Sequence, residues 1–263
     1  MLLIIEALLL ILAALGQDHR AAAVSEVKLD MALNSVDDQF MGCKSKMAYL
    51  VKTKYLVKEI NSSPQFKIGW KVGENVIKFP IGYLTRNHLI AIYVYSDNNI
   101  YKQFNPVNRY GRKQYESKTY KWYSLNFLLT DALQILKKTQ NGCRYTFRGT
   151  NVEFDKYVLN KEIRFGSFAS SSTDYNVARG FGSKSCFEIY TCEGADVAKY
   201  SKYPYEKEVL IPPYEKFKVT AVRMKKYQPN LWCDTVYTLK STGTRSNLNC
   251  ALFKKPNMYN GFY

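Results

Sequence analysis

Histidine is almost absent from this sequence, which contains only His19 and His88 among 263 residues. Catalytic sites of the Ser-His-Asp and Cys-His kinds need a histidine base, so they have little support here. No two cysteines have CxxC spacing and histidine ligands are scarce, so we expect no metal site. The glycine-rich motifs GxGxxG and GxxxxGK[ST] are missing, so neither the Rossmann nor the P-loop type of nucleotide binding is indicated. We interpret His88, in an apolar neighbourhood, as structural.

A long hydrophobic run is also missing. The apolar stretch Leu2–Leu15 is interrupted by Glu6 and is too short to span a bilayer comfortably. Small residues follow it, so we interpret residues 1–16 as a signal peptide and residues 17–263 as a single domain. A cut after Ala23 and an uncleaved N-terminal membrane anchor are the alternatives.

The remaining features of the ends and of the cysteines agree with export. The chain closes on Asn257–Tyr263 without a hydrophobic tail, so we expect neither a GPI signal nor a C-terminal membrane anchor. Six cysteines, an even number, are typical of disulfides formed in an oxidising compartment. Asn61 begins an N-x-S glycosylation sequon. We expect a soluble, secreted, extracellular monomer with a glycan acceptor at Asn61.

Acidic residues are outnumbered by basic ones, 22 against 38, for a formal charge of +16. The basic residues are dispersed, and their denser spots Lys52–Lys58, Lys225–Lys226 and Lys254–Lys255 are short. Dispersed charge is typical of a solvated face, so we expect no specific nucleic-acid partner, only a salt-sensitive attraction to acidic glycans or cell surfaces. A heparin- or nucleic-acid-binding module, the alternative, would need a continuous basic face.

Helical patterns come first along the chain and strand patterns second, which indicates an α+β fold. Residues 27–62 have apolar positions at helical spacing up to Asn61–Pro64, and Trp122–Lys138 has the pattern of an amphipathic helix. Tyr83–Tyr95 fits a helix or a strand. The predicted strands are Arg144–Arg148, Ile163–Ser170, Ser185–Thr191, Glu208–Ile211, Lys216–Lys225 and Trp232–Leu239.

Three short features in the second half can carry chemistry. Arg148 and Gly149 end a predicted strand, where a guanidinium can reach a phosphate and a glycine lets a ligand approach the backbone. Ser170–Ser172 offers three hydroxyls that can orient a carboxylate. Glu206 and Glu208 lie two apart, so they share one side if Glu208 begins a strand. Taken singly, an Arg-Gly pair, a serine-rich turn and a solvated acidic turn are the more ordinary interpretations.

Read together and in this order, the three features resemble the R-S-ExE signature of the mono-ADP-ribosyltransferases. The similarity, to the arginine-specific vertebrate ecto-enzymes of that family, covers nearly the whole chain after the leader. The other matching segments are Leu29–Ala32, Asp37–Phe40, Leu128–Leu133, Phe165–Ser172, Phe187–Pro213 and Tyr237–Gly243. The resemblance implies an ADP-ribosyltransferase fold, with a helical N-terminal half packed on a β-sandwich-like NAD-binding core.

The resemblance also implies an activity and a role for each site residue. The enzyme would transfer ADP-ribose from NAD to arginine side chains of acceptor proteins, releasing nicotinamide, without a metal. Arg148 would bind the phosphate and ribose side of NAD, and the backbone of Gly149 the nicotinamide amide. Ser170 would hold Glu208, whose carboxylate stabilises the oxocarbenium-like cation. Glu206 would grip the acceptor guanidinium and remove its proton.

Two disulfides follow from the family pattern, Cys43–Cys250 and Cys143–Cys192. Cys186 and Cys233 remain, and we predict that they bond to each other, because two free thiols are uncommon in an exported protein. Two functional alternatives stay open: an NAD glycohydrolase, in which water replaces arginine, and a secreted binding protein that has lost catalysis on the same fold.

Overall fold

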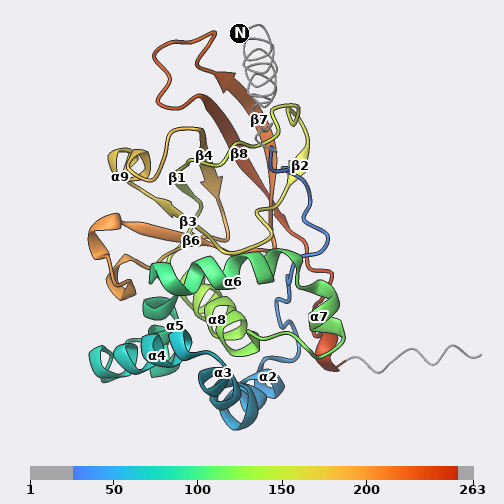
Figure 1. Ribbon diagram of the computed structural model, residues 1–263, viewed down its shortest axis with the longest axis vertical. Helices are drawn as coiled ribbons and strands as arrows, with labels where there is room; N and C mark the ends of the chain where they lie inside the picture. The colour runs from blue at the N-terminus through green and yellow to red at the C-terminus, as the bar shows by residue number, and fades with distance from the viewer. Residues whose placement is uncertain (1–25, 254–263) are drawn as a thin grey trace, which may run out of the picture.

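All the labelled helices of the computed structural model except one short helix beside the sheet gather at one end of the molecule, and the strands lie at the other (Figure 1). The structure describes residues 26–253, so the predicted leader, its alternative cleavage point and the C-terminal segment lie outside it. No helix among the described residues is long and apolar enough to cross a membrane. The predicted α+β class is confirmed.

The first helical stretch is continuous from Lys44 to Ser62 and ends where the sequence predicted. Its end is encoded by Ser63, whose hydroxyl accepts a hydrogen bond from the Phe66 amide, and by Pro64 at the first position of the next helix. Asn61 is exposed in the last turn before this break. The elements are α2 (Lys44–Leu50), the π-helix η1 (Val51–Tyr55), α3 (Leu56–Ser62) and α4 (Pro64–Val76).

The ambiguous segment Tyr83–Tyr95 forms a helix, α5 (Arg86–Tyr95). A capping box decides its start, since the Thr85 hydroxyl accepts from the His88 amide while His88 Nδ1 accepts from the Thr85 amide. His88 is therefore structural, as expected. The apolar run is continuous because this helix is buried on most of its faces.

Helix α8 (Tyr123–Thr139) forms the centre of the helical layer, within one residue of the predicted bounds. Its apolar face is fully buried, as at Leu125, Leu129 and Leu133. Helices α6 (Asn98–Tyr110) and α7 (Arg112–Glu116) precede it.

The strands form one mixed sheet in the order β2-β7-β8-β4-β1-β3-β6-β5, in which β4 and β8 are parallel and the other neighbours antiparallel. A short helix, α9 (Tyr175–Arg179), follows β3, and the 3-10 turns η2 (Ala198–Tyr200) and η3 (Pro204–Glu206) precede β6. The strands are β1 (Arg144–Thr150), β2 (Glu162–Ile163), β3 (Ala169–Ser172), β4 (Ser185–Thr191), β5 (Ala195–Asp196), β6 (Glu208–Ile211), β7 (Glu215–Met224) and β8 (Thr235–Thr244).

The sheet has two parts that meet at a narrow junction, where β1 and β3 pair only through Phe147 and Ser172. Side chains of the two parts pack on each other, Ala169 and Ile211 from one part with Phe187 and Phe217 from the other. The core is therefore sandwich-like, and the junction leaves room for a site beside it.

The predicted single strand Ile163–Ser170 is wrong, because this segment changes partner in its middle. Its start, β2, pairs with β7, and its end belongs to β3, which pairs with β6. Gly166 turns the chain between them with a φ of 70°. Arg109 of α6 donates to the Phe165 carbonyl and fastens the turn to the helical layer.

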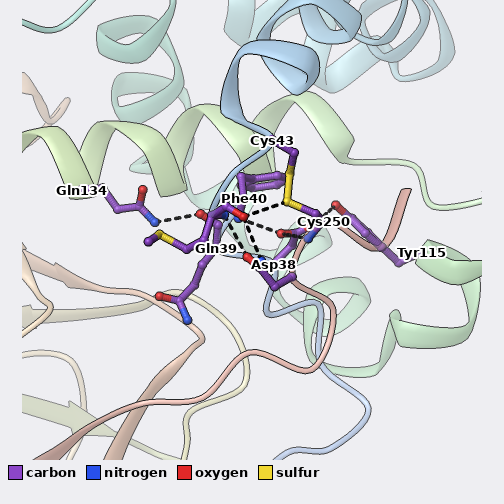
Figure 2. Close-up of a disulfide and its surroundings, with 9 residues drawn as sticks. Asp38, Gln39, Phe40, Cys43, Tyr115, Gln134 and Cys250 are labelled. Carbon is purple, nitrogen blue, oxygen red and sulfur yellow. Dashed lines mark hydrogen bonds between the residues drawn. A yellow bond between two sulfur atoms is a disulfide. The ribbon is translucent and has the colours of Figure 1, made fainter. Parts of the chain in front are cut away.

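A latch of buried carboxylates and a disulfide joins the two ends of the described chain. Asp37 forms a 2.5 Å ion pair with Arg164, both fully buried, and accepts the amides of residues 247 and 248. Figure 2 shows the adjoining part, where Asp38 accepts the Cys250 amide at 2.9 Å and the Tyr115 hydroxyl at 2.8 Å beside the Cys43–Cys250 disulfide.

The other two cysteine pairs lie within the strand layer. Cys143 is bonded to Cys192, which joins the start of β1 to the end of β4. Cys186 of β4 is bonded to Cys233, just before β8. These are the pairs named in the sequence analysis.

Candidate active site

A cavity of about 490 Å³ opens at the junction between β1 and β3. The five residues to which the family resemblance gives a role all line it, and they come from β1, β3, the turn η3 and β6. The lining residues are Tyr95, Ser96, Tyr101, Asn105, Phe147, Arg148, Gly149, Thr150, Ser170, Ser171, Ser172, Ala178, Phe181, Tyr203, Tyr205, Glu206 and Glu208.

Arg148 braces the junction of the sheet. Its Nη1 donates to the Ser170 carbonyl at 2.6 Å, so one arm of the guanidinium holds β3 while the side chain stays half-buried at the cavity wall. Burial lowers the pKa of Arg148, an effect that nearby Tyr95, Tyr101 and Glu208 oppose. A guanidinium stays charged in proteins, so the site keeps one fixed cation.

Gly149 is required by the packing of the protein itself. A Cβ at this position would overlap the carbonyl oxygens of Ala178 and Gly182. The glycine thus lets the end of α9 and the segment after it lie directly on β1, beside the Cys186–Cys233 disulfide.

The three serines of β3 make different contacts. Ser170 faces Glu208 and helps to keep its carboxyl ionised. The hydroxyl of Ser171 donates to the Val209 carbonyl at 2.8 Å and is buried in the ladder with β6. The hydroxyl of Ser172 donates to the Glu206 carbonyl at 2.7 Å, so it fastens the turn that carries Glu206.

Glu206 and Glu208 both reach the cavity, but the predicted reason is wrong. Strand β6 begins at Glu208, whereas Glu206 ends the 3-10 turn η3, and Lys207 between them has a left-handed φ of 49°. Strand alternation therefore does not apply to the pair. The turn is what brings the second carboxylate to the cavity wall, where it is half-exposed.

Glu208 is the deepest charge of the site, with only 4% of its surface exposed. Burial raises its pKa from the usual value of 4.5 to about 7, and Glu206 adds to this rise. Ser170, Arg148 and Ser201 oppose it. Burial also raises the pKa of Glu206.

The helical layer supplies residues that the sequence analysis missed. The Tyr95 hydroxyl of α5 donates to the Phe168 carbonyl at 3.0 Å and accepts from Asn105 of α6 at 3.1 Å, so two helices hold the chain that leads into β3. The Asn105 Oδ1 atom is buried at the cavity without a hydrogen-bond partner among residues 26–253. These residues lie more than 40 positions from the motif, and no spacing in the sequence connects them with it.

The mouth of the cavity is aromatic. Phe181 is 54% exposed and Tyr205 is 69% exposed, and both line the opening. Exposed rings offer flat apolar surface to a planar ligand. The site therefore combines a guanidinium suited to phosphate, a buried carboxylate suited to a developing positive charge, and a second carboxylate near the opening.

The family model described as NAD:arginine ADP-ribosyltransferase matches residues 29–238. NAD(P)(+)–arginine ADP-ribosyltransferase 2 of Gallus gallus is 36% identical over 238 residues, which cover 87% of this chain and 74% of the relative. Ecto-ADP-ribosyltransferase 5 of Rattus norvegicus is 33% identical over 270 residues, which cover 95% of this chain and 84% of the relative.

The fold is similar to solved structures as well. The crystal structure of the eukaryotic mono-ADP-ribosyltransferase ART2.2 has 29% sequence identity and a TM-score of 0.72, over 87% of this chain and all of that one. A mutant of ART2.2 solved in complex with NAD has a TM-score of 0.70 over the same shares. The ADP-ribosyltransferase HopU1 of Pseudomonas syringae, at 16% identity and a TM-score of 0.53 over 60% of this chain and 77% of that one, shares the fold.

Proposed function

The chain belongs to the NAD:arginine ADP-ribosyltransferase family, and we propose that it transfers ADP-ribose from NAD to arginine side chains of acceptor proteins, with release of nicotinamide. One observation carries the proposal: Arg148, Ser170, Glu206 and Glu208 line one cavity although they come from four different elements. The residues between 26 and 253 bury helices against one sheet, which supports a single catalytic domain.

In this proposal Arg148 and Glu208 act on NAD. The free edge of the Arg148 guanidinium binds the phosphate and ribose side, while its other edge remains on the Ser170 carbonyl. The bond between ribose C1′ and the nicotinamide nitrogen breaks, and its electron pair leaves with nicotinamide. Glu208, as a carboxylate bonded to the ribose 2′-hydroxyl, stabilises the oxocarbenium-like cation that forms. Its burial strengthens this interaction, because no bulk water screens it.

Glu206 acts on the acceptor. Its carboxylate lies nearer the opening than Glu208 and is half-exposed, so an incoming arginine can pair with it. A guanidinium is a poor nucleophile while protonated. As its nitrogen forms the bond to C1′, the proton passes to Glu206, and Ser172 keeps the turn bearing Glu206 in place.

The proposal is tested with purified protein, labelled NAD and agmatine, a small arginine mimic. We expect ADP-ribosyl-agmatine to form, and Glu208→Gln to reduce its formation by at least about a hundredfold, the size found when one electrostatic group of an active site is removed. Glu206→Gln should abolish transfer to agmatine while hydrolysis of NAD to free ADP-ribose continues.

Other outcomes would replace the proposal. Free ADP-ribose alone would make the enzyme an NAD glycohydrolase. Neither product, from a sample whose three disulfides are intact by mass spectrometry, would make the chain a binding protein on a transferase fold.

The three disulfides fit an extracellular, oxidising compartment. We propose that the protein acts there, with a glycan on Asn61, whose exposed position on α3 leaves room for it.

A further inference from the structure

A second cavity, of about 270 Å³, lies beside the first on the helical layer. One wall is α4, through Ile68, Gly69 and Val72, and the other is the corner between α5 and α6. Its lining is mostly apolar, yet Ile68 and Val72 are 66% and 41% exposed. We call this cavity the α4 groove.

The α4 groove and the catalytic cavity share a wall. Ser96 and Tyr203 line the catalytic cavity, and their chain neighbours Asp97 and Lys202 line the α4 groove. The wall is fixed, because the Lys202 amide donates to the Ser96 hydroxyl at 2.9 Å and Lys202 Nζ pairs with Asp97 at 2.8 Å. A protein whose arginine enters the catalytic cavity therefore lies within reach of the groove.

The apolar surface extends along α4 beyond the groove. Ile68, Val72 and Val76, each one helical turn apart, are all exposed, while the opposite side of the helix is buried at Phe66 and Trp70. An exposed stripe of aliphatic residues on a helix is typical of an interaction surface.

The glycine in the floor of the groove is unnecessary for packing. Gly69 lies inside α4, where glycine is less favourable than alanine, and a Cβ there would make only ordinary contacts with Val94 and Ile100. By contrast, a Cβ on Gly73 of the same helix would press on Ile90 at 2.9 Å. Gly73 is explained by helix packing, whereas the effect of Gly69 is to leave the groove open.

Two exposed lysines beside the groove favour a partner that carries negative charge. Lys67 and Lys71 flank the stripe, are exposed, and form no ion pair with any residue between 26 and 253. The whole chain carries a formal charge of +16. A partner that carries carboxylates beside an apolar side chain would match both the stripe and these lysines.

We propose that the α4 groove binds the acceptor protein, seating one apolar side chain near the target arginine and pairing acidic neighbours with Lys67 and Lys71. This inference rests on the proposed function and adds the class of acceptor. The groove would lower KM for such acceptors and leave the chemistry at Glu208 unchanged.

The test uses synthetic peptides with one arginine, an acidic linker and a single leucine. The leucine is placed about two to eight residues from the arginine, a reach of roughly 7–28 Å in an extended chain. Matched peptides carry serine in place of leucine. At the spacing that fits, we expect leucine to lower KM about tenfold, as burial of one such side chain allows, with kcat unchanged.

Variants then locate the effect. Val72→Asp should remove the advantage of leucine, while the kinetics with agmatine and the melting temperature stay as in the wild type. Val57→Asp is the matched control, an exposed valine on α3 that does not line the groove. Gly69→Ala should reduce the leucine advantage while the melting temperature stays the same or rises. If Gly69 served only the packing of α4, the substitution would lower the melting temperature instead.

The proposal is overturned if leucine has no effect at any spacing, or if Val72→Asp weakens agmatine and peptides equally. It is also overturned if Val72→Asp abolishes binding to anionic phosphatidylserine vesicles without changing peptide selectivity, since the stripe would then be a lipid-binding surface. A wild-type enzyme inactive on agmatine would contradict the proposed function instead. Fluorescence anisotropy of labelled leucine and serine peptides would still report on the groove.

Discussion

The carboxyl of Glu208 shows how one residue acquires its chemistry from its surroundings. A glutamate in water is ionised above its pKa of 4.5, but here burial raises the pKa to about 7. The neighbouring Glu206 raises it further, while Ser170 and Arg148 hold it down. Burial and the other three residues of the motif thus together set the protonation of Glu208.

This pKa predicts how activity depends on pH. The proposed role of Glu208 requires the carboxylate, so kcat/KM for agmatine should increase roughly tenfold between pH 6 and pH 8. Glu206→Gln removes the neighbouring charge that raises the pKa of Glu208, so the profile of NAD hydrolysis by this variant should shift to lower pH. A wild-type profile that is flat between pH 6 and pH 8 would contradict the assigned role of Glu208.

At the scale of elements, a buried glutamate of one helix caps the start of a second helix. Helix α8 lacks a side-chain cap of its own at Trp122, and Glu59 of α3 accepts the Ser124 amide at 2.8 Å in its place. Burial raises the pKa of Glu59 to about 8, although donors at the start of α8, the Ser124 amide first among them, lower it, so the carboxyl is largely protonated near neutrality. The cap therefore ties two helices together without a buried charge.

Glu59 predicts a pH dependence of stability. The folded state holds the proton up to about pH 8 and the unfolded state only to about 4.5, so the free energy of unfolding should fall as pH rises between these values. Each unit of pKa shift corresponds to about 1.4 kcal/mol, which sets an upper limit of about 5 kcal/mol. Urea unfolding of the wild type and Glu59→Gln at pH 5 and pH 8 measures it.

The Glu59→Gln variant should resemble the protonated residue, because glutamine has the same shape and no charge. We expect similar stability of the two proteins at pH 5 and greater stability of the variant at pH 8. If the difference in the free energy of unfolding between the two proteins is the same at pH 5 and pH 8, Glu59 is ionised in the folded protein at both.

At the scale of the whole molecule, the latch joins residues near both ends of the described chain. The Cys43–Cys250 disulfide closes a loop with a sequence separation of 207, against 47 for Cys186–Cys233. A longer closed loop removes more entropy from the unfolded chain, by about 5 kcal/mol for the first pair and about 4 kcal/mol for the second on the chain-entropy argument.

Removal of the latch disulfide should therefore lower stability and preserve the chemistry. For Cys43→Ala combined with Cys250→Ala, we expect the free energy of unfolding to fall by about 3–5 kcal/mol. The rate of agmatine modification at 20 °C should stay within about twofold, because no latch residue lines the catalytic cavity. Urea unfolding and the agmatine assay measure the two effects, and a loss of activity in the folded variant would show that the latch shapes the site.

Much of this protein could be predicted from local sequence, because it depends on local physics. Apolar spacing placed α8 to within one residue, and Ser63 with Pro64 encode the break before α4. The types and order of Arg148, Ser170, Glu206 and Glu208 carry the resemblance to the family, so these site residues are predictable from the sequence alone.

Tertiary structure decided what depends on residues far apart in the chain. The turn at Gly166, which Arg109 fastens through the Phe165 carbonyl, divides one predicted strand into β2 and β3. The first pairs with β7 and the second with β6. The turn η3 brings Glu206 to the cavity, where strand alternation had been expected to do so. Helices α5 and α6 supply Tyr95 and Asn105, which no pattern connected with the motif. Local spacing encodes an element, whereas burial, pKa and cavity shape arise only when elements meet.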